Sequence, residues 1–574
     1  MKRFDDQRRI TITRNVREGI VLPAVPPQRG RAMPAQGLAL GHEIMATFKA
    51  LKGRHQKRVI DLFRPFRATG NKNDRQPRAL SWAGIVLPRW GEQRQPTLRC
   101  STFGLLGLLI TVCLFAAQAR AEDWPQFRGI NASGVSTSNK KLPTEFSLEK
   151  NLRWSVKLGD GVGCPIIAGG KVFTTAMTGE KTFSIFAFDA ASGKKFWQKD
   201  YETGKLPRIT PPNSHASSTP ASDGQRVFAY FSTLGLLSLD AASGEEQWKR
   251  SLPSPNYLMD WGAASSPIVH DGTVYFNQDD DLSPTLFALN AKTGAIKWTT
   301  ERLDMLAGYA VPVICEANGQ TDVVISGTGF LKGYDPATGS ERWSSNSTLR
   351  TMMTSPVVRD GIIYLSCQSY GDEKRTLKFA LLEWLDTNQD GKLSKAEIPK
   401  EFWSRFDVSD KNSDGVIADG ELDTAFQSAK NQAGGGTTIQ AVRGGGSGDV
   451  SKTHVLWNVH NKAPSNLVSP VVVGEQLFIV KKGGLSSSFD AASGKTHWEL
   501  SRIRNIGDYY ASPVAGDGKI YVAGENGFIV VLEQGPKLNI LATNDVGESC
   551  IATPAIAEGR IFIRGRESLF CFGE

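Results

Sequence analysis

The most regular feature of this chain is a repeated alternation of apolar strands and glycine turns. In each copy a small residue and a proline precede an apolar pair, a glycine turn, and an apolar or aromatic strand. The phrase occurs eight times, in copies that begin at Cys164, Ser218, Ser266, Val311, Ser355, Ser469, Ser512 and Thr553. Alternating positions on both sides of a turn indicate paired β-strands, so the body of the chain is predicted to be all-β.

A second repeated phrase follows most copies and ends on a tryptophan. Asp or Asn, small residues and a Gly lead into Trp197, Trp248, Trp298, Trp343 and Trp498. The phrase adds two strands to each unit, and the first four tryptophans are 51, 50 and 45 residues apart. Four-stranded units of this period are propeller blades. We predict an eight-bladed β-propeller, or seven blades if the divergent fourth copy is not one, with tryptophans packed between blades.

The two ends of the repeat region complement each other. Trp154 ends a strand that has no earlier strands in its unit, and the last unit, which ends at Glu574, lacks a fourth strand. Pairing these strands would complete blade eight and cover its open edge. The ring is therefore predicted to close between the first and last strands of the repeat region.

The charge of the chain is concentrated before residue 100. The whole chain has 67 Lys and Arg against 58 Asp and Glu, but residues 1–100 alone hold 21 and 7 of them. The folded body is thus slightly acidic, and no nucleic-acid partner is expected.

The segment at residues 99–121 has the order of a secretory signal peptide. Arg99 precedes an apolar run at 103–117, and Ala119-Arg120-Ala121 follows as a cleavage site. We expect an exported protein, periplasmic or extracellular, that is anchored to a membrane only if this segment stays uncleaved. Residues 1–98 are then either an untranslated, misassigned start or a basic disordered extension.

The repeat is interrupted in blade five by residues 371–436. Residues 122–370 supply blades one to four and the start of blade five, and 437–574 supply the rest. The insert holds two twelve-residue segments, Asp386–Glu397 and Asp410–Glu421, that match the EF-hand calcium loop at every diagnostic position. Helices are expected at 377–385, 398–406 and 421–429. The sequence therefore predicts a small α-helical EF-hand pair between the second and third strands of blade five.

Each loop offers the hard oxygen ligands that calcium requires. The ligands expected in the first loop are Asp386, Asn388, Asp390, Lys392 through its carbonyl, Ser394 and Glu397. Those in the second loop are Asp410, Asn412, Asp414, Val416 through its carbonyl, and Glu421, with water at Ala418. Three ligand carboxylates in each loop repel one another without a cation, so calcium should stabilise the insert. Leu393 and Ile417 are expected to form an antiparallel contact between the loops.

The A-x-D-A-x-T/S-G-x-x-x-W phrase resembles the pyrroloquinoline-quinone-type propeller repeat. The motif at Trp124-Pro-Gln-Phe-Arg-Gly129 is similar to the N-terminal signature of exported bacterial proteins of this class. The resemblance covers residues 124–370 and about 437–574. The repeat occurs in quinone-dependent alcohol dehydrogenases, in an outer-membrane barrel-assembly lipoprotein and in domains attached to bacterial serine/threonine kinases. The resemblance therefore implies the fold and leaves the activity open.

Three functions follow from the resemblance. Quinone-dependent enzymes imply adjacent cysteines, a catalytic Asp beside a channel calcium and often haem, but the chain has no Cys-Cys pair and no C-x-x-C-H motif. We therefore expect no quinone cofactor and favour a non-catalytic scaffold or binding module with two calcium ions and a protein or cell-envelope partner. A quinone-dependent dehydrogenase is the first alternative. A sensor propeller without kinase activity is the second, since H-R-D and D-F-G are missing.

Residues just before the Ser-Pro phrases should gather at one mouth of the channel. They are His215, Trp261, Tyr309, Met353, Asn466, Tyr510 and Cys550. Mixed aromatic and polar groups are typical of a small-molecule pocket, although ordinary loop packing gives the same pattern. Cys164 and Cys550 lie in neighbouring blades in this arrangement, and we hypothesise a disulfide between them.

Overall fold

The structure is a computed structural model of the 574-residue chain. It describes residues 122–305, 308–346, 353–369, 378–426, 436–460, 467–481 and 483–574, which all belong to one compact unit. The expected signal segment and N-terminal extension lie outside the described residues. Within the described ranges, no helix combines the length and apolarity that a membrane crossing requires.

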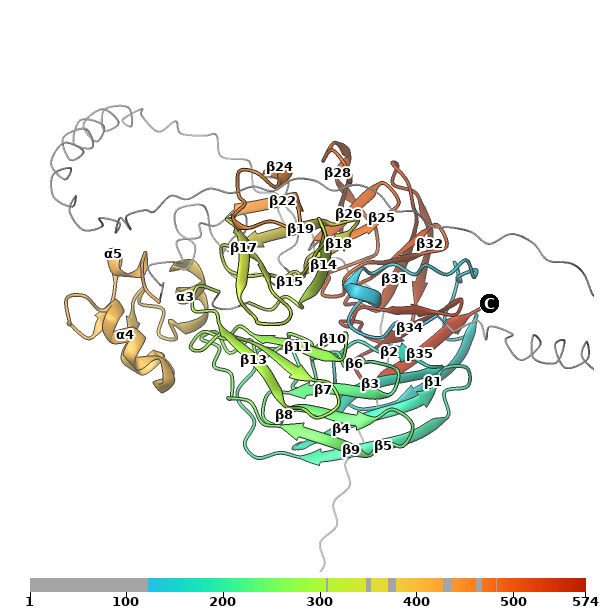
Figure 1. The fold of residues 1–574 in the computed structure, drawn as a ribbon, viewed down its shortest axis with the longest axis horizontal. Helices are drawn as coiled ribbons and strands as arrows, with labels where there is room; N and C mark the ends of the chain where they lie inside the picture. Colours follow the sequence, from blue (N-terminus) through green and yellow to red (C-terminus); the bar gives the residue numbers. More distant parts are fainter. Residues whose placement is uncertain are drawn as a thin grey trace, which may run out of the picture. The chain divides into compact units, whose positions relative to one another are not determined.

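Eight antiparallel sheets follow one another along the chain and confirm the eight-bladed propeller (Figure 1). Blade one consists of β2 (Ile166–Ala168), β3 (Lys171–Gly179), β4 (Thr182–Asp189) and β5 (Lys195–Glu202). Blade two consists of β6 (Ala221–Ser222), β7 (Arg226–Phe231), β8 (Gly235–Asp240) and β9 (Glu246–Arg250). Blade three consists of β10 (Ile268–His270), β11 (Thr273–Gln278), β12 (Thr285–Asn290) and β13 (Ile296–Glu301), and blade four of β14 (Val313–Ala317), β15 (Gln320–Ser326), β16 (Leu331–Tyr334) and β17 (Glu341–Ser345). The divergent fourth copy is therefore a blade.

The second half of the ring repeats this order. Blades five and six consist of β18 (Val357–Arg359), β19 (Ile362–Ser369), β22 (Gly436–Arg443), β24 (Val455–His460), and β25 (Val471–Val473), β26 (Gln476–Lys481), β27 (Leu485–Asp490), β28 (Thr496–Arg502). Blades seven and eight consist of β29 (Val514–Gly516), β30 (Lys519–Ala523), β31 (Phe528–Glu533), β32 (Ile540–Asp545), and β33 (Ala555–Ala557), β34 (Arg560–Arg564), β35 (Ser568–Gly573), β1 (Leu152–Lys157). A short parallel strand, β23 (Gly448–Asp449), joins blade four beside β17.

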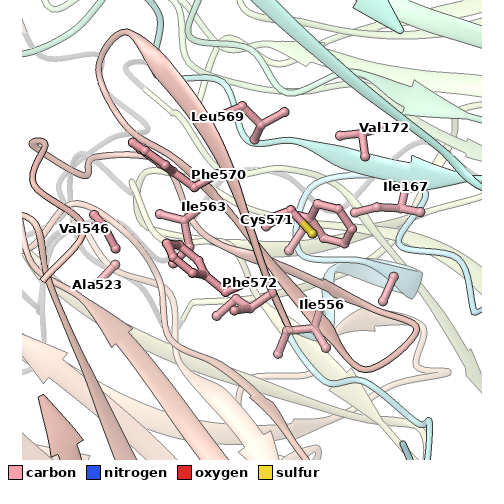
Figure 2. Close-up of a cluster of buried hydrophobic side chains, with 14 of the residues drawn as sticks. Ile167, Val172, Ala523, Val546, Ile556, Ile563, Leu569, Phe570, Cys571 and Phe572 are labelled. Carbon is pink, nitrogen blue, oxygen red and sulfur yellow. The ribbon is translucent and has the colours of Figure 1, made fainter. Parts of the chain in front are cut away.

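The ring closes as the sequence predicts, because β1 pairs antiparallel with β35. Trp154 lies opposite Cys571, and Lys157 lies opposite Ser568. Figure 2 shows the apolar core at this junction, where β35 side chains lie among residues of neighbouring blades such as Ile167 and Ala523. Burial of this continuous core across the junction stabilises closure of the ring.

The repeated tryptophans join each blade to the next. Trp248 Nε1 donates to the carbonyl of Ala291 at 2.9 Å, and its indole covers Gly294, where a Cβ would lie 2.5 Å from the ring. The same contact is made by Trp154, Trp197, Trp298 and Trp457. Trp343 instead donates to Asp322 at 2.8 Å within its own blade. Blade five has a Gly-rich segment, Gly444–Gly446, where blades one to four and six have an Asp/Asn-x-x-x-Gly turn, so Trp343 has no such turn to contact there.

The N-terminal segment, residues 122–136, contacts the inner strands of seven blades. It includes the 3-10 helix η1 (Ile130–Ala132). The hydrogen bonds join Trp124 to Ile167, Pro125 to Ser222, Gln126 to Val269, Asn131 to Ile314, Arg128 to Pro470, Ser136 to Ala515 and Glu122 to Glu558. The Trp124–Gly129 motif therefore ties blades together across the channel.

Candidate functional site

The insert leaves and re-enters blade five at the far ends of two paired strands. Ser369 of β19 lies opposite Gly436 of β22, so the insert begins and ends at the same end of this strand pair. The described elements of the insert are α3 (Lys378–Leu385), β20 (Leu393–Ser394), η2 (Lys395–Glu397), η3 (Lys400–Phe402), α4 (Trp403–Ser409), β21 (Val416–Ile417) and α5 (Asp419–Leu422). The insert thus lies between the second and third strands of the blade, where the interrupted repeat placed it.

The two candidate calcium loops have almost the same geometry. In the first, Asp386 accepts hydrogen bonds from the backbone of Asp390 at 3.2 Å and of Gly391 at 2.9 Å. In the second, Asp410 accepts from the backbone N–H groups of the corresponding residues at the same two distances. The glycines have φ of +77° and +86°, a conformation that favours glycine. Both loops therefore turn sharply around an inward-pointing carboxylate at their first position.

A glutamate connects the two ends of each loop. Glu397 accepts from Thr387 N–H at 3.0 Å and from Ser394 N–H at 2.8 Å. Burial would raise the pKa of Glu397, but these donors outweigh it and the pKa lies below its ordinary value. Glu421 accepts from Lys411 and Ala418 in the same way, at 2.8 Å and 3.3 Å.

The loops pair with each other through the predicted contact. Leu393 lies opposite Ile417, and Ser394 lies opposite Val416, in a two-stranded antiparallel sheet. Both apolar side chains are fully buried in the core of the insert. The expected last helix is shorter than predicted, since α5 ends at Leu422 and Phe426 has a φ of +57°. The positive φ is incompatible with a continuing helix, and residues 427–429 lie outside the described residues.

The oxygen donors of both loops are of the chemical types that bind calcium. Each loop offers three carboxylates, one amide oxygen and a backbone carbonyl, all of them hard oxygen donors. In the part of the chain that the structure describes, no three His, Cys, Asp or Glu side chains form a ready-made metal cluster. The carboxylates of Glu397 and Glu421 accept hydrogen bonds from backbone N–H groups. To coordinate a calcium ion, these carboxylates would have to give up those hydrogen bonds.

The insert shares its apolar core with a loop of blade three. Leu258 and Met259 are buried among the insert side chains, and Trp261 packs against the same cluster. Arg405 of α4 donates to the carbonyl of Asp281 in blade three and, at 3.0 Å, to that of Phe426. This contact joins residues that lie far apart in the sequence, and it places the insert beside Trp261, which lines the mouth of the channel.

A cavity of about 350 Å³ opens at one mouth of the channel. Four of the predicted mouth residues line it: Trp261, Tyr309, Met353 and Tyr510. Two others do not. His215 lies half-buried nearby with a pKa lowered by burial, and Cys550 is fully buried. Asn466 lies outside the described residues.

The hypothesised disulfide between Cys164 and Cys550 is wrong, because both residues are free thiols. Cys550 Sγ contacts the carbonyl of Glu548 at 3.3 Å, and Cys164 Sγ accepts the backbone N–H of Thr553 at 3.2 Å. The two sulfurs therefore contact separate backbone groups. Burial raises the pKa of Cys550 to about 12, which keeps this thiol protonated and unreactive.

The floor of the cavity is a ring of residues that the sequence marks as repeat positions and that were not among the predicted mouth residues. They precede the proline of each repeat copy, and we call them the pre-proline ring: Cys164, Thr219, Ser266, Val311, Ser355, Ser469, Ser512 and Thr553. Seven backbone N–H groups of the ring donate to a neighbouring ring side chain at 2.9–3.2 Å. Val311 has no acceptor atom and interrupts the series. The small residue before each proline was the visible signal for this ring.

Comparison with known proteins agrees with the repeat and the fold. A family model described as Outer membrane protein assembly factor BamB matches residues 147–262 and 184–422 in overlapping alignments. The chain is a propeller of the pyrroloquinoline-quinone repeat type.

Two curated relatives of this quinone-repeat propeller have different functions. BamB of Yersinia pestis, an outer membrane protein assembly factor, is 27% identical over 241 residues, which are 39% of this chain and 57% of that protein. Polyvinylalcohol dehydrogenase of a Pseudomonas species is 23% identical over 371 residues, 55% of this chain and 53% of that protein. The chain thus spans little more than half the length of these relatives. The crystal structure of Moraxella catarrhalis BamB matches 74% of this chain and 97% of that one, at 13% identity and a TM-score of 0.46.

Proposed function

We propose that this protein is an exported, non-catalytic propeller that serves as a scaffold or binding module in the cell envelope and binds two calcium ions through its insert. The single observation that carries the calcium assignment is the repeated loop geometry. Two loops, each with carboxylates at positions one, five and twelve and a left-handed glycine at position six, pair through a short antiparallel sheet. This combination is the one expected of an EF-hand pair, and it supports the calcium assignment.

The calcium ions would be held by the ligands predicted from the sequence. Asp386, Asp390 and Glu397 would provide the charge of the first site, and Asp410, Asp414 and Glu421 that of the second. Bound calcium would neutralise these carboxylates and fix the angle between α3 and α4, which in turn holds the insert against blade three. The ions lie in the insert, so they would not act in the channel.

The scaffold assignment rests on the similarity to an outer membrane assembly factor and on the nature of the channel. The described residues that line the cavity carry no ionisable carboxylate, imidazole or amine. This supports binding rather than proton abstraction from an alcohol. The similarity to polyvinylalcohol dehydrogenase keeps a quinone-dependent enzyme as the second candidate. The partner we propose is a protein of the cell envelope.

Calorimetry with calcium chloride tests the metal assignment directly. We expect about two ions per chain, and about one for each of Glu397→Gln and Glu421→Gln, because the twelfth residue closes the coordination shell. Glu401→Gln is the matched control, since this exposed glutamate lies in the insert but in neither loop. Absence of calcium binding at millimolar concentration would refute the assignment.

Two experiments test the scaffold assignment. Crosslinking in the native envelope followed by mass spectrometry should recover one envelope protein reproducibly, and the purified pair should form a complex in solution. In parallel, the protein should reduce no dye when given alcohols, pyrroloquinoline quinone and calcium. Alcohol-dependent dye reduction would replace the scaffold assignment with the dehydrogenase.

A further inference from the structure

The backbone groups of Glu122 and Glu558 bind each other's side chains. The N–H of Glu122 donates to Glu558 Oε1 at 2.5 Å, and the N–H of Glu558 donates to Glu122 Oε2 at 3.3 Å. Glu122 lies two residues before Trp124, and Glu558 lies in the turn between β33 and β34 of blade eight. The two hydrogen bonds therefore join the start of the N-terminal segment to the blade that closes the ring.

Two carboxylates share one lysine at this contact. Lys140 Nζ forms an ion pair with Glu558 Oε2, and within the described ranges no other cation pairs with either glutamate. The Glu122 carboxylate is held by neutral donors, the hydroxyl of Ser136 at 2.5 Å and the N–H of Ser138 at 3.3 Å. The side chain of Glu558 is only 28% exposed, so its charge is screened less than one at the open surface. A second cation at this position would balance the second carboxylate.

The residues after Glu122 fix the position of its nitrogen. Asp123 Oδ1 accepts the backbone N–H of Gly169 at 2.9 Å. Trp124 exchanges two backbone hydrogen bonds with Ile167, at 2.8 Å and 2.9 Å. Both partners belong to blade one. The nitrogen of Glu122 therefore faces Glu558 whether it belongs to a peptide bond or to the end of a chain.

The sequence has an expected processing site directly before this nitrogen. Ala119-Arg120-Ala121 is the end of the expected signal segment, so cleavage falls between Ala121 and Glu122. Hydrolysis of this peptide bond uses one water molecule and leaves a carboxylate on Ala121 and an ammonium group on Glu122. A neutral amide donor thus becomes a cation at the point where two carboxylates share one lysine.

We propose that removal of the signal segment by a signal peptidase creates an ion pair between the new α-ammonium group of Glu122 and the carboxylate of Glu558. The new charge strengthens the contact between blade one and blade eight, so processing completes the closure of the ring. Before cleavage the same nitrogen is an uncharged amide, and the repulsion between the carboxylates is less well balanced. The precursor is therefore less stably closed until it has been exported. The proposal rests on the export that is part of the proposed function, and it does not depend on the calcium assignment.

The charges around the new amino group determine how its effect depends on pH. The carboxylates of Glu558 and Glu122 face it, and Asp123 adds a negative charge one residue along the chain, whereas Lys140 opposes them. The carboxylates should raise the pKa of the amino group above the ordinary range of a chain terminus. Because the pKa is raised in the folded state, the stabilisation is fully present below the ordinary pKa and is lost as the pH rises through the raised pKa.

Two processed forms of the full chain isolate the effect of the charge. One gene encodes the natural sequence, and the other has Gly-Ser inserted between Ala121 and Glu122, so that its processed chain keeps a peptide N–H at Glu122. Both are expressed with export in a bacterial host, and mass spectrometry should find Glu122 as the first residue of the natural form. At about pH 7 an acylating reagent should modify the α-amino group of the natural form at least about tenfold more slowly than that of the extended form, because one pKa unit is a tenfold change in neutral amine.

A charge-removing variant distinguishes the ion pair from simple burial of the amino group. Glu558→Gln keeps an oxygen acceptor of the same size, so the amino group should react at least about threefold faster only if the charge protects it. Glu567→Gln is the matched control, because this exposed glutamate lies in the same blade and pairs with Lys157 at 3.5 Å. The control should leave the rate unchanged. Equal rates in the natural form and in Glu558→Gln would refute the ion pair, and this comparison needs no extended chain.

Scanning calorimetry measures the effect on closure of the ring. At about pH 7 the natural form should melt about 1–2 °C above the extended form, as expected for one partly buried ion pair in a large domain. The difference should disappear at about pH 10, where the amino group is neutral, and in Glu558→Gln. A difference that persists in Glu558→Gln would overturn the proposal.

The outcomes distinguish this ion pair from export itself. A processed chain that begins at a residue other than Glu122 would refute the ion pair and leave export in place. A chain that stays unprocessed in the cytoplasm would contradict both. A chain that begins at Glu122, with an amino group as reactive as that of the extended form, would support export and refute the ion pair.

Discussion

The backbone N–H of Thr553 donates to Cys164 Sγ at 3.2 Å, although 389 residues separate them along the chain. This bond joins blade eight to blade one at the innermost strands. The pairing of β1 with β35 joins the same part of the ring through the outer strand of blade eight. The propeller is therefore closed at two distances from its axis: by the pair of outer strands and, close to the channel, by the pre-proline ring.

Removal of the acceptor at Cys164 should destabilise the closure. Cys164→Ala leaves the buried N–H of Thr553 unsatisfied, and we expect the free energy of unfolding to fall by about 1–3 kcal/mol. Cys164→Ser is the control, because its hydroxyl replaces the sulfur as acceptor and should cost less. Urea unfolding followed by circular dichroism measures both. Equal losses for Ala and Ser would show that the hydrogen bond is unimportant.

The effect on stability of the contact between a tryptophan and a turn glycine can be distinguished from the effect of backbone strain at that glycine. Gly294 and Gly272 both have a φ of +67°, but a Cβ on Gly294 would lie 2.5 Å from the ring of Trp248, whereas none lies within 4 Å at Gly272. Each alanine variant should lose about 1–2 kcal/mol from the left-handed backbone. Gly294→Ala should lose about 1–3 kcal/mol more from overpacking. Denaturation curves that show the same loss at both positions would contradict this role of Trp248.

The ion pair between Asp279 and Arg302 should be sensitive to loss of one partner. Both side chains are buried, with Nε–Oδ1 at 2.8 Å and Nη2–Oδ2 at 2.9 Å, and Arg302 also donates to the hydroxyl of Tyr334. Burial alone would lower the pKa of Arg302, but Asp279 outweighs it and raises the pKa. Asp279→Ala should cost about 3–5 kcal/mol because it leaves a buried charge unpaired. Glu145→Ala, in an exposed pair with Lys150, is the control, and thermal unfolding measures both.

Calcium should raise the thermal stability of the protein if it binds the insert. At a calcium concentration about one hundred times the Kd, one site stabilises the native state by about 2.7 kcal/mol. The combined variant Glu397→Gln and Glu421→Gln should lose the stabilisation, and a chelator should abolish it in the wild type. An identical melting temperature with calcium and with chelator, at concentrations where calorimetry detects binding, would show that the ions are not coupled to folding.

Calcium should also change the surroundings of Trp261. This residue packs against the insert core and lines the channel cavity, so a rearrangement of α4 reaches it directly. We expect a calcium-dependent change in tryptophan fluorescence that is reduced in Trp261→Phe and retained in Trp197→Phe, whose indole lies between blades one and two. An unchanged signal in Trp261→Phe would assign the response to the insert tryptophans instead.

The sequence by itself determined the propeller fold with eight or, as the alternative, seven blades, the closure by β1 and β35, and the location of the insert. These features depend on alternating strands, turn chemistry and repeat period, which are local properties of short segments. The paired loops were also visible, because each set of candidate ligands lies within twelve consecutive residues. The docking of the insert on Leu258 and Met259 was not visible, since it joins surfaces from blades three and five.

Only the tertiary structure decided what faces the channel. Of the six predicted mouth residues that the structure describes, four line the cavity, because the loops before the inner strands differ from blade to blade. The pre-proline ring and the burial of Arg128 likewise depend on distances across the channel between residues far apart in sequence. An arginine is normally exposed, so nothing in the sequence around Arg128 indicated that this residue is buried. The repeat specifies each blade, but only the closed ring brings eight copies of one position together.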